Sequence, residues 1–449
     1  MLTIILMILG IIYLGLIISE IFYISITMSG EKSQPLRKMS DDYQQPFVSI
    51  IVPTFNEKKN IALCLNSLKR LDYNNYEIIV SDGGSQDGTI EIAQSIVDTV
   101  IVNKTLPPGW IGKNWGCHLG YLHAKGEYLL FVDADTIHTQ KSLKTFMKIA
   151  LERDSALFTV FPYQIIKKWW ESINPVFYFA SHLVSGGVNS INNPLRKESF
   201  IASGQYMLFK RKDYEKIGGH ETIKGSIVDD FSLARVVKVQ LGRLYYLDGS
   251  KLVKTRMYPD SAKQCWNGWK KCLYPGTKVT TGKRITGALL WYLWALATPV
   301  AIVLTSLYTS WPFIVAACLS YLFCCLTVYL YWRKRGDQIW VLYVFLPVTV
   351  IIFCVLLGVS ALEMIIKKET VWRGRVYTPN LYAGTEHHTK IEYSKLEFYQ
   401  MSQLETDLEL ELNDNMQPHL PGQKIAVETN VMSNKSSTDY LTITESTND

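Results

Sequence analysis

Apolar blocks long enough to cross a lipid bilayer are the feature that most constrains how this chain folds. Residues 1–28 form the first block, and three more follow at 286–308, 312–332 and 339–366. Because a helix of about 20 apolar residues spans the hydrocarbon core of a bilayer, the sequence predicts an integral protein of the cell membrane with several crossings. The first block lacks a small-residue cleavage site, so we interpret it as a retained anchor and not as a signal peptide.

Basic residues flank the last apolar block on both sides. Arg-Lys-Arg-Gly occupies residues 333–336, and Trp-Arg-Gly-Arg occupies residues 372–375. Basic flanks favour the cytosol, and three complete C-terminal crossings cannot keep both flanks there together with a cytosolic main domain. Either residues 339–366 form a re-entrant hairpin broken near Pro347, or one junction lies elsewhere. We expect a multi-pass protein with its main domain in the cytosol, and the path of this block stays open.

The formal net charge of +6 conceals an acidic tail and a basic body. From Leu381 onward twelve Asp and Glu oppose four Lys and Arg, so the rest of the chain carries about 14 net positive charges. Residues 395–449 are polar, acidic and poor in aromatic side chains, which predicts a disordered tail. A basic, membrane-bound body suits an anionic substrate or a headgroup surface. Nucleic acid is not an expected partner, because no basic stripe accompanies a nucleic-acid-binding motif.

The eight cysteines are scattered, and no pair has metal-ligand spacing. Cys324 and Cys325 lie within an apolar block, and Cys64 falls on the apolar side of a predicted helix. We therefore predict eight reduced cysteines that fill space in the interior, which favours a cytosolic main domain.

Between residues 47 and 255, short strand-like runs alternate with helical patterns. Strands are predicted at 48–53, 76–82, 99–103 and 127–133. Apolar strands that alternate with helices are typical of βαβ units and of a mostly parallel sheet buried on both faces. Ligands of such sheets bind at the carboxyl ends of the strands. Three predicted strands deliver polar side chains to this edge, namely Asn56, Asp82 and the pair Asp133 and Asp135.

The segment SDGGSQDGT at residues 81–89 follows the second predicted strand. Asp82 can accept hydrogen bonds from a nucleobase or a ribose, and Gly83 allows a ligand close to the backbone. Since Asp, Gly and Ser are also the usual residues of tight turns, a simple turn is the alternative.

Asp133 and Asp135 stand two residues apart at the end of the fourth predicted strand. Alternation along a strand would place both carboxylates on one face, where they could bind one hard divalent cation together with phosphate oxygens of a substrate. The alternative is a solvated strand end, or a cap by Asp135 on a following helix.

Asp229 and Asp230 open an amphipathic helix predicted within residues 226–235. Acids at a helix N-terminus are common caps, because they bind the exposed amide groups there. The functional alternative is a general base, since a well-placed carboxylate can take the proton of an attacking hydroxyl. Similarly Lys113, within the Gly- and Trp-containing segment 106–120, either meets a diphosphate at a helix start or belongs to a packed loop.

Aromatic and basic residues occur together in several segments, among them 167–190 and 265–276. We interpret both as interfacial helices, because Trp, Tyr and Phe beside Lys suit the headgroup level of a bilayer, and a core helix is the alternative. Four residues of this kind could hold a phosphate or a lipid headgroup, or could anchor the chain at the membrane interface: Arg256, Trp269, Arg373 and Arg375.

The order of these features resembles the family-2 glycosyltransferases over about residues 47–275. VPTFNE at 52–57 comes first, followed by Asp-Gly-Gly-Ser at 82–85, Asp-x-Asp at 133–135 and the acidic pair about a hundred residues later. Further segments are similar to the diaponeurosporenoate and hopene-associated glycosyltransferases of isoprenoid pathways: LPPGWIGKNWGCHLG (106–120), GGH (218–220), TRMY (255–258) and WRGRVY (372–377).

This resemblance implies a Rossmann-like α/β fold of the nucleotide-diphospho-sugar transferase (GT-A) type, and an inverting hexosyltransferase. It implies that Asp82 and the loop after the first strand bind the donor nucleoside. Asp133 and Asp135 would then serve the diphosphate and a divalent cation, Mg²⁺ or Mn²⁺, and Asp230 would be the base. We expect a nucleotide-sugar donor, with UDP favoured, and a lipid-phase acceptor such as a carotenoid or another isoprenoid acid or alcohol. Towards an acid acceptor, Asp230 would mainly orient the acceptor.

Two departures from the family narrow the prediction. The acidic pair is Asp-Asp where Glu-Asp is commoner, and QCWNGW at 264–269 replaces the Gln-x-x-Arg-Trp signature of processive members. We therefore expect the protein to transfer a single sugar, and polymer synthesis is the less favoured activity. A polyprenyl-phosphate sugar transferase, a processive polysaccharide synthase and a non-catalytic membrane scaffold remain as alternatives.

The expected organisation is an anchor at 1–28, a catalytic domain with interfacial helices at 47–280, a C-terminal transmembrane region at 285–366 and the tail at 395–449. The candidate catalytic residues are Asp229 and Asp230, and the candidate metal ligands are Asp135 and Asp133. The candidate donor-binding residues are Pro53, Thr54, Asn56, Glu57, Asp82, Gly83, Lys113 and Asp133. The candidates for contacts with acceptor, phosphate or interface are Gly204, Gln205, Arg256, Trp269, Arg373 and Arg375.

Overall fold

The computed structural model describes residues 13–15, 17, 18, 21, 24, 25, 43–280, 282–309, 311–338, 340–372 and 375–378. Most of the predicted anchor and the whole of the predicted acidic tail lie outside these residues. All eight cysteines are free, but they do not all fill the interior as predicted, because Cys354 is exposed.

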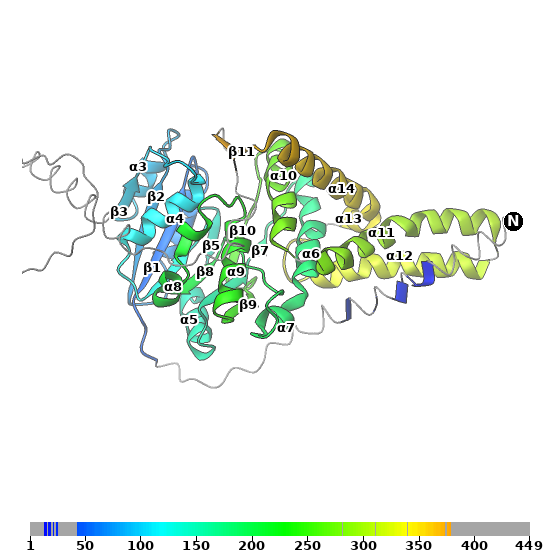
Figure 1. Ribbon diagram of the computed structural model, residues 1–449, viewed down its shortest axis with the longest axis horizontal. Helices are drawn as coiled ribbons and strands as arrows, with labels where there is room; N and C mark the ends of the chain where they lie inside the picture. The colour runs from blue at the N-terminus through cyan, green and yellow to red at the C-terminus, as the bar shows by residue number, and fades with distance from the viewer. Residues whose placement is uncertain are drawn as a thin grey trace, which may run out of the picture. The chain divides into compact units, whose positions relative to one another are not determined.

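A seven-stranded sheet with the order β3-β2-β1-β4-β8-β6-β9 forms the core of the α/β part (Figure 1). Its strands are β1 (Val48–Thr54), β2 (Tyr76–Asp82), β3 (Thr99–Val102), β4 (Tyr128–Phe131), β6 (Leu157–Phe161), β8 (Met207–Lys210) and β9 (Leu244–Asp248). Neighbouring strands are parallel except around β8, which runs antiparallel to β4 and β6. The predicted mostly parallel sheet is therefore confirmed, and the four predicted strands correspond to β1–β4.

The strands are buried on both faces, because their apolar side chains alternate between two cores. The helices of this part are α2 (Ile61–Leu68), α3 (Thr89–Gln94), α4 (Gly112–His123), α5 (Ser142–Glu152), α8 (Arg211–Lys216), η2 (Gly219–Ile223) and α9 (Asp229–Gln240). Ile51 and Phe131 pack in one core with residues of α4 and α9, whereas Ile50 and Leu130 pack in the other with residues of α2 and α5. This arrangement explains the uninterrupted apolar runs of the strand sequences.

A second, three-stranded sheet brings two loops of the chain together. Its strands are β5 (Thr136–His138), β10 (Val253–Thr255) and β7 (Tyr163–Gln164), in the order β5-β10-β7. Thr136 pairs with Thr255. The chain that follows Asp135 therefore lies beside the chain that precedes Arg256.

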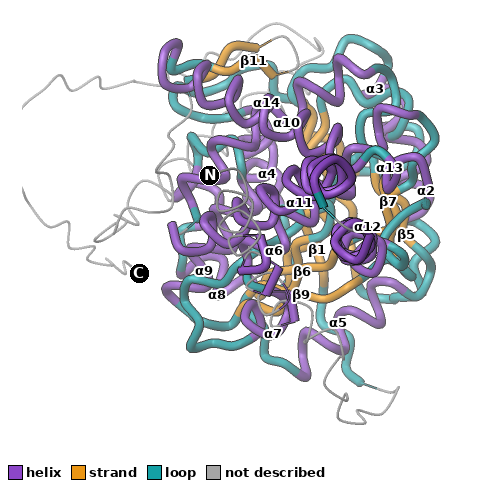
Figure 2. The backbone as a smooth tube through the Cα atoms, turned by 90° about the vertical axis from the view of Figure 1, so that its right-hand side faces the viewer, coloured by secondary structure: helices purple, strands orange, loops and turns teal. Residues whose placement is uncertain are grey.

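Within the part of the chain that the structure describes, three helices are long and apolar enough to cross a membrane, covering Arg284–Tyr308, Trp311–Trp332 and Leu346–Lys367. They belong to α11 (Gly282–Tyr308), α12 (Trp311–Trp332), and α14 (Leu346–Leu362) with the π-helical turn η3 (Glu363–Lys367). Helices α11 and α12 pack side by side and are seen nearly end-on in Figure 2. Helix α14 packs against α11 and against α10 (Ala262–Val279). A short hairpin of β11 (Thr370–Trp372) and β12 (Arg375–Tyr377) follows η3.

The last apolar block is broken near Pro347. The short helix α13 (Trp340–Val344) ends just before α14 begins, and Pro347 occupies the first turn of α14. Proline lacks the amide hydrogen that an internal helical bond needs but fits a first turn, which explains why a new helix starts here. The path of this block through a membrane stays a prediction.

The first segment interpreted as interfacial contains η1 (Trp169–Ile173), α6 (Asn174–Ser185) and α7 (Gly187–Asn192). Helix α6 packs against α11, α12 and α14, and Phe177 and Phe179 are at most 1% exposed. The structure thus favours the core-helix alternative for α6. Trp169, in contrast, is 76% exposed.

Candidate active site

Three strands of the large sheet end at one cavity of about 880 Å³. Thr54 ends β1 opposite Asp82, which ends β2, and Asp133 lies two residues beyond β4. These three residues line the cavity together with Asp229 and Asp230 at the start of α9. The expected convergence of polar side chains at this edge is present in the structure.

Asp133 and Asp135 lie in a turn and not on a strand. Strand β4 ends at Phe131, and the amide and hydroxyl groups of Thr136 donate to the carbonyl oxygen of Asp133 over 3.2 and 2.8 Å. The predicted strand 127–133 is therefore too long at its C-terminal end, and the two acids do not share one face of a strand as expected. Both residues nevertheless line the cavity.

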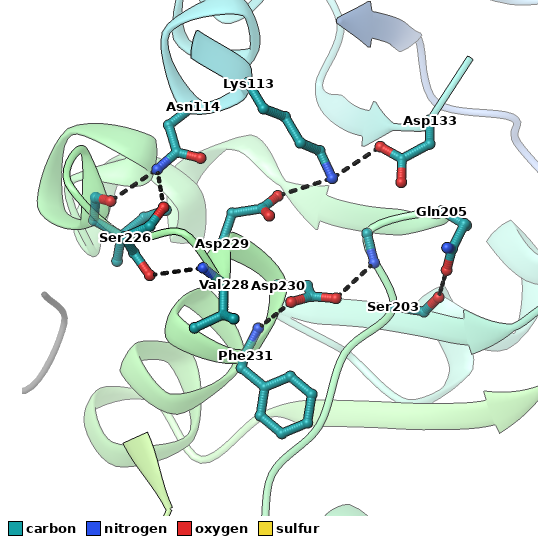
Figure 3. A network of polar contacts seen from close by, with 12 residues as sticks. Lys113, Asn114, Asp133, Ser203, Gln205, Ser226, Val228, Asp229, Asp230 and Phe231 are labelled. Carbon is teal, nitrogen blue, oxygen red and sulfur yellow. Dashed lines mark hydrogen bonds and ion pairs between the residues drawn. The ribbon is translucent and has the colours of Figure 1, made fainter. Parts of the chain in front are cut away.

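Lys113 joins two acids that come from distant parts of the chain. Its Nζ atom lies 2.8 Å from Oδ1 of Asp133 and 3.1 Å from Oδ2 of Asp229 (Figure 3). The neighbouring Asn114 donates to the carbonyl oxygen of Ser226 over 2.9 Å, which ties α4 to the loop before α9. Burial alone would lower the pKa of Lys113, but Asp133 and Asp229 raise it well above its ordinary value. Lys113, a candidate for diphosphate binding, is thus a fixed cation between two acids.

The carboxyl groups of the two acids that begin α9 have pKa values shifted in opposite directions. Burial raises the pKa of Asp229, but Lys113 above all lowers it, and the net pKa lies below the ordinary value. Burial and the negative charge of Asp229 raise the pKa of Asp230 to about 6. Asp230 also accepts hydrogen bonds from the amides of Gly204 at 3.2 Å and Phe231 at 2.8 Å. The pair combines one carboxylate held ionised with one whose pKa suits proton transfer near neutrality.

Gly204 lies where these groups meet. A Cβ atom at this position would stand 2.7 Å from Nζ of Lys113, 3.5 Å from Oδ2 of Asp133 and 3.8 Å from Oδ2 of Asp230. A side chain here would push the lysine away from its acids. Glycine at this position therefore lets the backbone approach the network closely.

Asp82 is 1% exposed, and its carboxylate is already engaged. It accepts hydrogen bonds from the hydroxyl of Thr54 at 2.8 Å, from the amide of Gly84 at 2.8 Å, and from both the amide and the hydroxyl of Ser85 at 2.7 Å. A carboxylate offers about four acceptor positions. Asp82 therefore organises its turn, as in the simpler of the two alternatives, and a direct bond to a nucleoside would require one of these partners to leave.

The loop after β1 is fastened to the same turn. The amide of Asn56 donates to the hydroxyl of Ser85 over 2.7 Å, and its side-chain oxygen accepts from the amide of Gln86 at 3.1 Å. Asn56 has a φ of 54°, a conformation that Asn adopts more readily than most residues. The remaining donor candidates line the same cavity, namely Pro53, Thr54, Glu57 and Gly83.

Only some of the residues that we expected to contact the acceptor, a phosphate or the membrane interface line the cavity. Those that line the cavity are Gly204, Gln205, Arg256 and Trp269. The indole N–H of Trp269 donates to Oδ1 of Asn174 over 2.9 Å, which joins α10 to α6. Arg373 lies outside the described residues, and Arg375 is described only by its backbone in β12.

The cavity has an apolar end that the sequence did not indicate. Helix α11 contributes Ile285, Leu289 and Tyr292, and α14 contributes Phe353 and Leu357. The rings of Tyr292 and Phe353 stack with their centroids 4.5 Å apart. Because these residues belong to uniformly apolar blocks, their spacing does not reveal which of them face the cavity. The cavity therefore connects the acidic group with candidate membrane-spanning helices.

The described residues supply fewer ligand atoms than a divalent metal ion requires. Among the described residues, no group of three or more His, Cys, Asp or Glu side chains is arranged to hold an ion. Asp133 and Asp135 offer hard oxygen donors of the kind that Mg²⁺ prefers, but fewer than an octahedral ion requires. The ammonium group of Lys113 already pairs with Asp133, so a divalent ion would share this carboxylate with Lys113. The site thus fits a divalent ion together with oxygens of a substrate and water.

Comparison with known sequences agrees with this geometry. Residues 49–218 match the family model described as glycosyl transferase family 2. A 4,4'-diaponeurosporenoate glycosyltransferase of Staphylococcus aureus (strain USA300) is 26% identical over 333 residues, which are 72% of this chain and 87% of that protein. The protein of the same name from strain MRSA252 is 25% identical over 331 residues, with the same coverage.

A solved structure shares the fold. The mannosyltransferase PcManGT from Pyrobaculum calidifontis, in complex with GDP-Man and Mn2+, superimposes with a TM-score of 0.51 at 18% sequence identity. The match covers 82% of this chain and 100% of that one. The sheet, the acid-lined cavity at its carboxyl edge and the family match agree. The chain is therefore a glycosyltransferase of the GT-A fold, whose residues 49–218 match glycosyl transferase family 2.

Proposed function

We propose that the protein transfers a single sugar, with inversion, from a nucleotide sugar to an isoprenoid acid or alcohol in the membrane. One observation carries this proposal: the same cavity is lined by Asp133 and Asp230 and by Leu289 and Phe353 of α11 and α14. An acceptor lying in the bilayer could reach the acids along these apolar side chains. The S. aureus relatives, named for 4,4'-diaponeurosporenoate, support an acceptor of this class.

The donor would occupy the polar end of the cavity. The loop after β1 and the turn of Asp82 would border its nucleoside, and the diphosphate would lie near Lys113 and Asp133. UDP-sugars are our first choice, and the GDP-Man in PcManGT makes GDP-sugars the second.

Asp230 would act as the general base towards an alcohol. It takes the hydroxyl proton while the acceptor oxygen attacks the anomeric carbon from the face opposite the diphosphate, which then leaves with the nucleoside. Attack from the opposite face inverts the configuration. Towards an acid acceptor, which is already ionised, Asp230 would only orient the nucleophile. A divalent cation bound by Asp135 and Asp133 would supply a Lewis acid for the leaving diphosphate.

We also propose a location in the cell membrane, with α11, α12 and α14 in the bilayer and the catalytic domain in the cytosol. The three apolar helices support the first part, and the basic segments beside them support the second.

The test uses the purified protein in lipid nanodiscs with UDP- and GDP-sugars and with isoprenoid acids and alcohols, and mass spectrometry of the products. Asp230→Asn should reduce transfer to an alcohol by about 100-fold or more. Asp98→Asn, which changes an exposed acid outside the cavity, is the matched control. Transfer to an alcohol at the wild-type rate by folded, membrane-inserted Asp230→Asn protein would overturn the role of Asp230 as the base. Wild-type protein that transfers no sugar to any isoprenoid acid or alcohol would overturn the proposal itself.

A polyprenyl-phosphate sugar transferase is the second candidate, because Arg256 in the cavity could bind an acceptor phosphate. The same mass spectra separate the candidates. A sugar on a lipid phosphate identifies this activity, and a series of lengthening products identifies a processive synthase.

A further inference from the structure

Glu171 is a buried carboxylate that the proposed mechanism does not use. It is 0% exposed. Its oxygens accept hydrogen bonds from the amides of Lys167 at 2.6 Å and Lys168 at 2.8 Å, and from Nε of Arg256 at 3.0 Å. A buried carboxylate is costly unless it is paired and hydrogen-bonded, so these three donors hold Glu171 in one place.

Arg256 uses only part of its donor capacity in this pair. A guanidinium carries five N–H donors in a planar fork. Among the described residues, the guanidinium of Arg256 donates one hydrogen bond. Its Nε–H is the donor, and Glu171 is the acceptor. The N–H groups of the two Nη nitrogens remain for a ligand of the cavity that Arg256 lines. Such a fork binds a phosphate or a carboxylate through two parallel hydrogen bonds.

The backbone beside Arg256 is held at further points. The indole N–H of Trp170, in η1, donates to the carbonyl oxygen of Tyr258 over 3.0 Å. Tyr258 has a φ of 59°, and its ring packs so closely on Gly268 of α10 that a Cβ atom there would collide with it. Helices η1 and α10 therefore fix the segment that carries Arg256. Because η1 leads directly into α6, this segment is also connected to the helices α11, α12 and α14.

We propose that Glu171 is a positioning residue, which holds Arg256 so that its two Nη nitrogens bind an oxyanion of a substrate in the catalytic cavity. This inference rests on the proposed function. The oxyanion belongs either to the diphosphate of the donor or to the acid group of the acceptor. Lys113 is less suited to this task, because its ammonium group already lies between Asp133 and Asp229.

The first experiment measures the KM values for donor and acceptor with Glu171→Gln, Arg256→Gln and the double variant in nanodiscs. Glu171→Gln should raise the KM for one substrate by about tenfold, equivalent to about 1.4 kcal/mol, with a smaller change in kcat. Arg256→Gln should raise it at least as much. The double variant should match Arg256→Gln, because Glu171 acts through Arg256. A raised donor KM identifies the diphosphate, and a raised acceptor KM identifies the acid.

Controls separate positioning from folding. Glu198→Gln removes a carboxylate 3.5 Å from Arg284, outside the cavity, and should leave both KM values unchanged. Arg256→Lys keeps the charge without the fork and should behave like Arg256→Gln. Because Arg256 is 29% exposed while Glu171 is buried, the two Arg256 variants test the proposal even if Glu171→Gln unfolds.

Three kinetic outcomes overturn the inference: unchanged KM values in Arg256→Gln, a loss of kcat alone in Glu171→Gln, or effects of the two substitutions that add. If the wild-type protein transfers no sugar, the proposed function is overturned and the kinetic test of this inference cannot be made. For that case, equilibrium binding of UDP, GDP and retinoic acid to wild-type and Arg256→Gln protein needs no transfer. Unchanged Kd values for all three ligands would overturn the inference by themselves.

Discussion

The Nζ atom of Lys113 lies 2.8 Å from the carboxylate of Asp133, and the same nitrogen is 3.1 Å from Asp229. A single cation thereby joins the start of α4, the turn after β4 and the start of α9. Its positive charge also favours the ionised form of Asp229, because Lys113 is the neighbour that most lowers the pKa of this acid.

Lys113→Met should destabilise the protein, because two acids lose the cation between them. Removing one partner of a buried ion pair costs about 3–5 kcal/mol, and we expect the lower end here, since Lys113 is 28% exposed. Chemical unfolding in detergent measures the effect. Lys144→Met breaks an exposed pair with Asp72 and should cost no more than about 1 kcal/mol. Equal losses in the two variants would contradict the role of Lys113.

Transfer to an alcohol acceptor should rise with pH through about 6 and then level off, because the raised pKa of Asp230 leaves the base protonated at lower pH. The measurement is kcat/KM from about pH 5 to about pH 8, with an acid acceptor for comparison. The acid acceptor should show a weaker rise, since it needs no base. Asp230→Asn should remove the inflection near 6, and a wild-type profile without that inflection would speak against Asp230 as the base.

The same raised pKa affects stability in a predictable direction. The pKa of Asp230 is about 6 in the folded protein and 3.8 for an ordinary Asp, so folding favours the protonated form. Its contribution to stability is present below about pH 4 and is lost as the pH rises through about 6. Asp230→Asn, which stays neutral, should therefore be more stable than the wild type at neutral pH. Unfolding curves near pH 7 and pH 5 test this, and the stability difference should shrink at the lower pH.

Local patterns were sufficient to predict β1–β4, because successive parallel strands with a helix between them form βαβ units. They did not predict β6, β8 and β9, which complete the sheet. They predicted that Asp82 and Asp133 end strands at a common edge, since parallel strands bring their carboxyl ends together. They did not predict the turn at Asp133, because the apolar run continues through Val132 after β4 has ended at Phe131. The conformation of Asp133 depends on the turn into β5, in which Thr136 donates two hydrogen bonds to the carbonyl oxygen of Asp133.

The charge pairs of the site could not be predicted in this way. Lys113 and Asp229 are far apart in the sequence, as are Glu171 and Arg256, and no local pattern assigns one partner to the other. The same holds for α6, because aromatic and basic residues suit both a headgroup layer and a helix buried against other helices. The composition of these segments therefore did not determine which other residues they contact.

Transfer should depend on a divalent cation that binds with the donor. Chelation by EDTA should abolish transfer, and Mg²⁺ or Mn²⁺ should restore it. Because Asp133 and Asp135 supply too few ligands alone, Mn²⁺ should bind more tightly when UDP is present. Electron paramagnetic resonance of free Mn²⁺ measures this, with Asp135→Asn expected to weaken binding and Asp98→Asn to leave it unchanged. Undiminished transfer in EDTA would exclude the cation from the reaction.

The apolar end of the cavity should select the acceptor without affecting the donor. Leu289 and Leu293 lie one turn apart on α11 and are 44% and 55% exposed, but only Leu289 is among the residues that line the cavity. Leu289→Trp should narrow the path from the bilayer and raise the KM for the acceptor by about tenfold, with the donor KM unchanged. Leu293→Trp adds the same side chain to the same helix and should change neither value. Steady-state kinetics in nanodiscs with acceptors of increasing length measure both variants, and the longest acceptor should be the most affected. An equal effect of the two substitutions would mean that the acceptor does not approach the acids along α11.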